Sequence, residues 1–92
     1  MAHEPQVGEI YYWAGSTDTC SLFMVLRERS PRLYDCLMVR GSSRYLDCVV
    51  NICSSRYLGN ATLFTGTLTD SEHRLAMTAL LDAETYIWEH TA

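Results

Sequence analysis

The chain has 92 residues and a formal net charge of −4, with 48% hydrophobic and 20% charged residues. This composition is typical of a single globular domain over residues 1–92 and excludes a disordered chain. The longest apolar run, residues 22–26, is far shorter than the ~20 residues that cross a bilayer, so no membrane span is predicted. The first residues lack the basic and apolar regions of a signal peptide, which favours a cytoplasmic location.

Three strands are predicted in the first half of the chain. Residues 7–13 (VGEIYYW) are rich in β-branched and aromatic side chains and precede a turn-forming segment. Residues 20–27 (CSLFMVLR) are apolar on both faces, as in a strand that is covered on both sides. Because Pro31 cannot donate to a strand ladder, it predicts a turn that joins this strand to residues 33–40 as a hairpin.

The cleanest alternation of apolar and polar residues lies at residues 44–52 (RYLDCVVNI). Its period of two predicts a half-buried strand. The inward face is predicted to carry Leu46, Cys48, Val50 and Ile52, and the outward face Tyr45, Asp47 and Asn51. Gly59 and Asn60 then mark a turn, and residues 62–65 predict a last short strand.

At Thr69 the sequence T-D-S-E predicts the start of a helix. In this capping box the Thr69 hydroxyl accepts from the backbone N–H of Glu72, and the Glu72 carboxylate reaches back. Apolar residues then recur at helical spacing as far as Trp88. One helix is therefore predicted over residues 70–90, with Trp88 packed in the core against the first strand.

This order of elements predicts an α+β, mainly β, fold: a small antiparallel barrel of four to five strands within residues 7–65, and one C-terminal α-helix at about 70–90. The opening strand VGEIYYW, followed by hairpin strands that end in V-L and M-V, resembles small SH3-like barrels of the PemK/MazF toxin type. The resemblance covers residues 7–40 at most. The second strand lacks the Arg-Pro pair of those toxins, so the resemblance implies a fold and no catalytic residue.

The four cysteines, Cys20, Cys36, Cys48 and Cys53, form no C-x-x-C pair. Three of them lie in apolar runs, where cysteine usually acts as a small apolar residue. Reduced structural thiols are the favoured interpretation, with a disulfide or a zinc site as alternatives. No metal and no cofactor is predicted.

A short repeat provides a candidate ligand site: GSSRYLD at residues 41–47 is followed by CSSRYLG at residues 53–59. Serine hydroxyls, loop N–H groups and a guanidinium can bind an anion, and a tyrosine beside them can stack on a base. The alternative is that both copies are turns that lead into strands. The candidate residues are Ser42, Ser43, Arg44, Tyr45, Ser54, Ser55, Arg56 and Tyr57.

Aromatic and acidic side chains suggest a protein interface. Tyr11 and Trp13 share one face of the first strand, and Ile10 and Tyr12 share the other. One of these two pairs is therefore expected to be exposed. Exposed Tyr and Trp are enriched at interface hot spots. The predicted interface residues are Tyr11, Trp13, Asp82, Glu84 and Glu89. Burial of most of these rings in the core is the alternative.

Charge is unevenly distributed along the chain. Residues 27–56 hold six arginines against three acids, whereas residues 57–92 hold Arg74 against five acids. The C-terminal acids would steer the protein towards a partner with a basic surface. Nucleic acid is disfavoured as a partner because the net charge is negative.

The sequence thus favours a non-enzymatic binding protein that acts through a protein interface, as an inhibitor or adaptor. By analogy with free-standing acidic domains of this size, a phage-encoded anti-defence protein is one example of that class. The first alternative is a homo-oligomer that binds or sequesters a phosphorylated small molecule or nucleotide through the repeated segments. The second alternative is a toxin-like barrel nuclease.

Overall fold

Five antiparallel strands and two C-terminal helices make up the part of the chain that the computed structural model describes, residues 5–13, 21–41, 46–53 and 61–91. The strands are β1 (Ile10–Trp13), β2 (Leu22–Ser30), β3 (Leu33–Arg40), β4 (Val49–Cys53) and β5 (Ala61–Leu63). The helices are α1 (Asp70–Leu81) and α2 (Ala83–His90). Within the described ranges, neither helix has the length and apolar character that crossing a bilayer requires.

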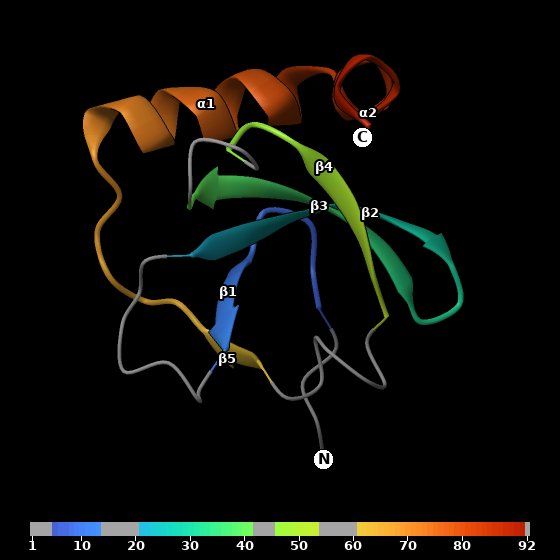
Figure 1. Cartoon of the computed structure of the whole chain (residues 1–92), viewed down its shortest axis with the longest axis horizontal. Helices are drawn as coiled ribbons and strands as arrows, with labels where there is room; N and C mark the ends of the chain where they lie inside the picture. Colours follow the sequence, from blue (N-terminus) through green and yellow to red (C-terminus); the bar gives the residue numbers. More distant parts are fainter. Residues whose placement is uncertain (1–4, 14–20, 42–45, 54–60, 92) are drawn as a thin grey trace.

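The strands form one sheet in the order β4-β3-β2-β1-β5 (Figure 1). The predicted hairpin of β2 and β3 is confirmed, with its turn at Pro31 and Arg32. Strand β5 returns to pair with β1 rather than with β4. Among the described residues, β4 and β5 are therefore the two edges of an open sheet. The five antiparallel strands are as predicted, but closure into an SH3-like barrel is not confirmed, because a barrel requires its two edges to pair.

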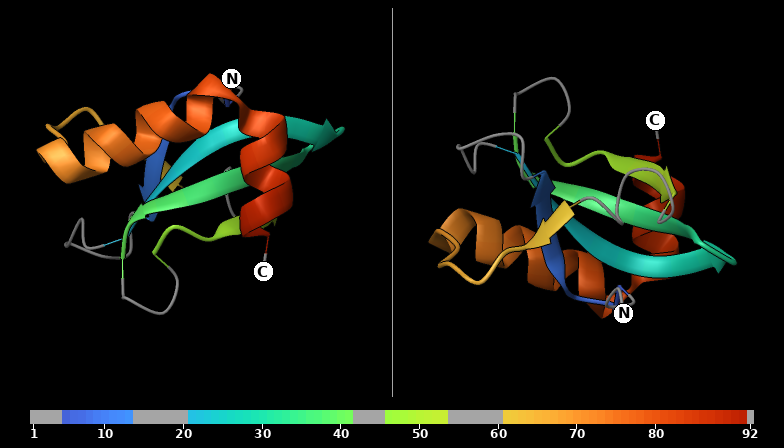
Figure 2. Two further views of the ribbon diagram at one scale, coloured as in Figure 1. Left: turned by 90° about the horizontal axis from the view of Figure 1, so that it is seen from above. Right: turned by 90° about the horizontal axis from the view of Figure 1, so that it is seen from below.

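Both faces of this sheet are covered by packed side chains. The two helices lie on one face (Figure 2), over a cluster that consists of Leu22, Met24, Leu26, Leu37, Val39, Val49, Ala76, Ala79, Tyr86 and Ile87. The opposite face carries a second cluster of Tyr11, Val25, Tyr34, Cys36 and Ile52, with Phe23, Val50 and Ala61 packed against it. Every strand contributes to the second cluster, since the sheet curls around this face (Figure 1).

Strand β4 differs from its predicted half-buried pattern because both faces of the sheet are covered. Val50 and Ile52 contribute to the second cluster, as the predicted inward face requires. Val49, on the other face, is also buried, because the helices cover that side. Leu46 was expected to point inward, but it precedes β4 and is exposed. The alternation therefore predicted the strand and the inward positions of Val50 and Ile52 correctly, but it wrongly placed Leu46 inside and did not anticipate the burial of Val49.

The start of α1 is the capping box predicted at Thr69, with both reciprocal bonds to Glu72 present. The prediction of one helix over residues 70–90 is wrong. The backbone of Asp82 is non-helical, with φ −148° and ψ 77°, and its side chain caps the start of α2. Aspartate is a favoured N-cap residue, because its carboxylate satisfies the free N–H groups of a first helical turn.

Candidate binding groove

A β-bulge in β2 determines which side chains lie under the end of α2. Val25 pairs with Cys36 and Arg27 pairs with Asp35, so β2 has one residue more than β3, at Leu26. The extra residue places both Leu26 and Arg27 on the side of the sheet that the helices cover. Beyond the bulge, this face of β2 therefore changes from apolar to charged.

Asp35 holds the two arginines that follow the bulge. Its side chain is 0% exposed, and its Oδ2 accepts from the Nε of Arg27 at 2.7 Å and from the Nε of Arg29 at 3.2 Å. The side-chain amide of Asn51 in β4 donates to Oδ1. A carboxylate can be buried when ion pairs and hydrogen bonds compensate for its lost hydration. Two guanidinium groups meet one carboxylate here, so a positive charge is left over.

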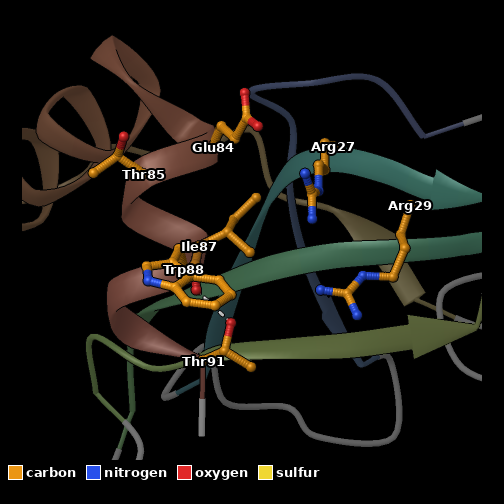
Figure 3. Close-up of a pocket in the computed structure, with 7 residues that line it drawn as sticks. All are labelled: Arg27, Arg29, Glu84, Thr85, Ile87, Trp88 and Thr91. Atoms are coloured by element: carbon orange, nitrogen blue, oxygen red, sulfur yellow. Dashed lines mark hydrogen bonds between the residues drawn. The ribbon is translucent and has the colours of Figure 1, made fainter.

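A groove of about 630 Å³ lies between these arginines and α2 (Figure 3). Its volume is within the range of ligand-binding clefts in proteins. Helix α2 forms the opposite wall, where the side chain of Trp88 is 86% exposed. The residues that line the groove are Arg27, Arg29, Glu84, Thr85, Ile87, Trp88 and Thr91.

The groove is charged at one wall and acidic at one end. The side chains of Arg27 and Arg29 are each 41% exposed, so both remain accessible to a ligand. Glu84 lies at the opposite end of the groove from Thr91 (Figure 3). Among the described residues, no ion pair joins Glu84 to either arginine. The positive charge of the arginine wall is therefore not neutralised by Glu84 at close range.

The wall formed by α2 is fixed at both ends of the helix. At its start, Asp82 accepts from the backbone N–H of Thr85 at 3.2 Å and from the Thr85 hydroxyl at 2.8 Å. At its end, the Thr91 hydroxyl donates to the carbonyl of Ile87, and Thr91 forms a parallel bridge with Val49. The groove thus lies between an anchored helix and the segment of β2 that follows the bulge.

The residues predicted to bind a phosphorylated ligand lie outside the part of the chain that the structure describes. They are Ser42, Ser43, Arg44, Tyr45, Ser54, Ser55, Arg56 and Tyr57. The SSRYL hypothesis accordingly stays a prediction. A phosphorylated small molecule or nucleotide as the ligand of these residues likewise stays a prediction.

The predicted interface residues have mixed outcomes. Tyr11 was expected to be exposed, but it is 5% exposed and belongs to the second cluster, because the sheet curls around that side chain. The backbone of Trp13 pairs with Ala61 in β5, and its side chain lies outside the description. The acids Asp82, Glu84 and Glu89 are exposed along α2, as an interface would require.

Trp88 is the reverse case of Tyr11. It was expected in the core against the first strand, but its side chain is exposed. The break at Asp82 changes the direction of the helix, and α2 buries Tyr86 and Ile87 instead. Trp88 is thereby left on the groove wall, where no aromatic residue was predicted.

The groove arginines were also missed, although the sequence carries two signals for them. Arg27 and Arg29 alternate at the end of an apolar strand, so both could be predicted to face one side. Asp35 is an acid within the apolar run LYDCLMV, and a buried acid needs cationic partners. The bulge at Leu26, which brings the arginines to the same face as Asp35, cannot be recognised from the alternation of residue types.

The buried thiol of Cys36 in β3 is poorly suited to act as a nucleophile or a metal ligand. Burial, with a smaller contribution from the negative charge of Asp35, raises the pKa of Cys36 to about 12. The thiol is therefore protonated at neutral pH, whereas the thiolate is the nucleophile and the metal ligand. Cys36 forms no disulfide within the described residues, and the same residues contain no cluster of three potential metal ligands.

A second hollow of about 510 Å³ lies beside α1 and α2. There the His90 ring stacks on Tyr86 with 3.8 Å between ring centroids, and Nε2 of His90 lies 3.8 Å from Oδ2 of Asp47. The other carboxylate oxygen of Asp47 is buried and has no hydrogen-bond partner in the described structure. Trp88 does not line this hollow, which makes the first groove the stronger candidate for binding a partner.

Comparison with known proteins places no constraint on this groove: no protein-family model, no curated protein and no solved structure matches the chain. The candidate function therefore depends on the geometry and chemistry described above.

Proposed function

We propose that this protein is a non-enzymatic binding protein, of the inhibitor or adaptor type, that docks on another protein through α2 and the groove beside it. The observation that carries the proposal is the 86% exposure of Trp88 on the groove wall. An exposed indole has a large apolar surface that gains free energy when a partner covers it, and Trp is among the commonest hot-spot residues.

The charges of α2 support a partner with a basic surface. Asp82, Glu84 and Glu89 are exposed along this short helix, and each would attract a cationic surface during encounter. Acids around a central aromatic residue correspond to the polar rim and apolar centre of known interfaces. The resemblance to PemK/MazF-type barrels stays a prediction, and the proposal does not depend on it.

A photo-crosslinking amino acid at position 85, an exposed position of the same groove that leaves Trp88 in place, tests the proposal in the native host. The partner trapped there is then purified, and its affinity is measured for the wild type and for Trp88→Ala. We expect the substitution to weaken binding at least about 30-fold, the factor that corresponds to a hot-spot loss of about 2 kcal/mol. The circular dichroism spectrum should be unchanged, because this side chain is exposed.

Met77→Ala is the matched control. Met77 is also an exposed apolar residue on a helix, but it does not line the groove. Its removal should change affinity less than twofold. Equal affinity of the wild type and Trp88→Ala for the trapped partner, or the absence of any specific cross-link at position 85, would rule out docking through this groove.

A further inference from the structure

We propose that the arginine wall of the groove receives a carboxylate from an acidic side chain of the partner, while an apolar neighbour of that side chain covers Trp88. This inference rests on the proposed function and adds the chemistry of the recognised segment. The basic surface of the partner faces the acids of α2, and one acidic residue enters the groove.

Asp35 holds the two guanidinium groups of the groove by the same atom, Nε. In the described structure, Arg27 and Arg29 both bond to Asp35 through Nε. Neither Nη group of either residue has a hydrogen-bond acceptor among the described residues. A guanidinium fixed at Nε keeps its two Nη groups as a fork, which matches the two oxygens of a carboxylate.

Asp35 compensates only one of the two positive charges of Arg27 and Arg29. Its Oδ2 accepts from both arginines, and its Oδ1 accepts from Asn51, so each carboxylate oxygen is already engaged. One buried negative charge faces two positive charges. A second carboxylate, brought by a partner, would balance them and would bind in a partly desolvated site, where charge-assisted hydrogen bonds are stronger than in water.

The groove is amphipathic, with charged side chains on one wall and apolar side chains on the other. Across from the arginines lie the exposed indole of Trp88 and the side chain of Ile87 (Figure 3). A ligand that fills the groove must therefore carry an anion on one side and an apolar group on the other. An acidic residue next to Leu, Ile or Phe in a polypeptide meets both requirements.

Glu84 and the net charge distinguish a peptide from a nucleic acid. A phosphodiester strand would bring successive negative charges past Glu84, which lines the same groove. The whole chain also has a net charge of −4 and would repel such a strand. A single carboxylate on the arginine wall brings one negative charge instead of a row of them, so both penalties are smaller.

The test uses a positional-scanning library of acetylated, amidated hexapeptides that contain no tryptophan. Trp13→Phe leaves Trp88 as the only tryptophan, so its fluorescence reports binding in the groove. We expect the library to select Asp or Glu next to Leu, Ile or Phe. Replacing that acid by Asn or Gln in the selected peptide should weaken binding at least tenfold.

Arg29→Gln is the deciding variant, because its bond to Asp35 is the longer of the two and the shorter bond of Arg27 is retained. We expect at least a tenfold loss of affinity for the acidic peptide and a smaller loss for Arg29→Lys, which keeps the charge without the fork. Arg74→Gln, an exposed arginine of α1 outside the groove, is the matched control and should have no effect.

Selection of peptides without an acid, or unchanged affinity in both Arg29 variants, would overturn the inference. It would also be overturned if ATP or a single-stranded oligonucleotide bound in the groove in place of the peptides. In either case the proposed function would stand as long as Trp88→Ala still released the trapped partner. If Trp88→Ala and Arg29→Gln both left that partner bound, the inference and the proposed function would fail together.

Discussion

Arg40, the last residue of β3, binds both carboxylate oxygens of Glu72 in the first turn of α1. Its Nε lies 2.5 Å from Oε2 and its Nη2 lies 2.7 Å from Oε1. The same Oε1 accepts from the backbone N–H of Thr69 in the capping box. The Arg40 guanidinium also lies 5.7 Å from the ring centroid of Phe64. One carboxylate therefore both starts the helix and attaches it to the sheet.

This pair makes stability depend on pH in the acidic range. The hydrogen bond from Arg40 is the main cause that lowers the pKa of Glu72 to about 2, from an ordinary value of 4.5. A lowered pKa means that the folded state binds the proton less readily than the unfolded chain. The stabilisation is thus fully present above about pH 4.5 and is lost as the pH falls towards 2.

Glu72→Gln should remove this dependence. We expect the difference in unfolding free energy between wild type and Glu72→Gln to be largest at neutral pH and to shrink between pH 4.5 and 2. Urea titrations at a series of pH values measure it. Asp70→Asn, an exposed acid in the same helical turn, is the matched control and should follow the wild type within about 1 kcal/mol. Parallel profiles of wild type and Glu72→Gln would contradict the expectation.

Asp35→Asn should destabilise the protein by about 1–3 kcal/mol, because the half-exposed guanidiniums of Arg27 and Arg29 lose the charge that holds them. The asparagine has nearly the same shape, so the loss reflects charge and hydrogen bonding rather than packing. Glu28→Gln, on the exposed side of the same hairpin, should stay within about 0.5 kcal/mol of the wild type. Chemical denaturation of the two variants provides the comparison.

Leu37→Ala should cost about 2–5 kcal/mol of stability, since this side chain is 0% exposed between the sheet and the helices. The same substitution at Leu81, which is 85% exposed, should change the unfolding free energy by less than about 0.5 kcal/mol. Thermal and urea unfolding of both variants measure the contrast. Similar losses at the two positions would mean that the helices do not pack on β3 as described.

Cys36 should resist alkylation in the native protein. Its pKa of about 12 keeps the thiol neutral, and its burial excludes the reagent. Peptide mapping after iodoacetamide treatment at neutral pH should show slower labelling of Cys36 than of the half-buried Cys48, with the difference abolished in urea. The raised pKa also predicts that its contribution to stability is present below about pH 9 and is lost as the pH rises towards 12.

Local patterns predicted the elements of this fold well. The turn at Pro31, the strands on both sides of it and the capping box at Thr69 all depend on residues close together in the sequence, and the structure confirms them. The break at Asp82 was missed because apolar residues continue at helical spacing across it. An aspartate within a helical pattern is compatible with either a helix interior or a new N-cap, and tertiary packing decides between them.

The groove was harder to predict because it depends on which face of each element is covered. Tyr11 and Trp88 are both large aromatic residues, and composition alone assigned the wrong one to the surface. Period-two alternation in β2 gives no indication of an inserted residue, so the side on which Arg27 and Arg29 emerge could not be derived. The sequence indicated that Arg27 and Arg29 share one face and that Asp35 needs a cationic partner, but not which face this is.

The packing of the helices depends on the number of residues in β2, which has one more than β3 at Leu26. This extra residue allows one strand to pack hydrocarbon under α1 and to present guanidinium groups beside α2. Deletion of Leu26 would leave Arg27 directly after Val25 in a regular ladder, so Arg27 would still lie opposite Asp35, but the helix-covered cluster would lose a buried leucine. The protein should therefore tolerate Leu26→Met better than deletion of Leu26, because only the deletion removes an apolar side chain from beneath the helices.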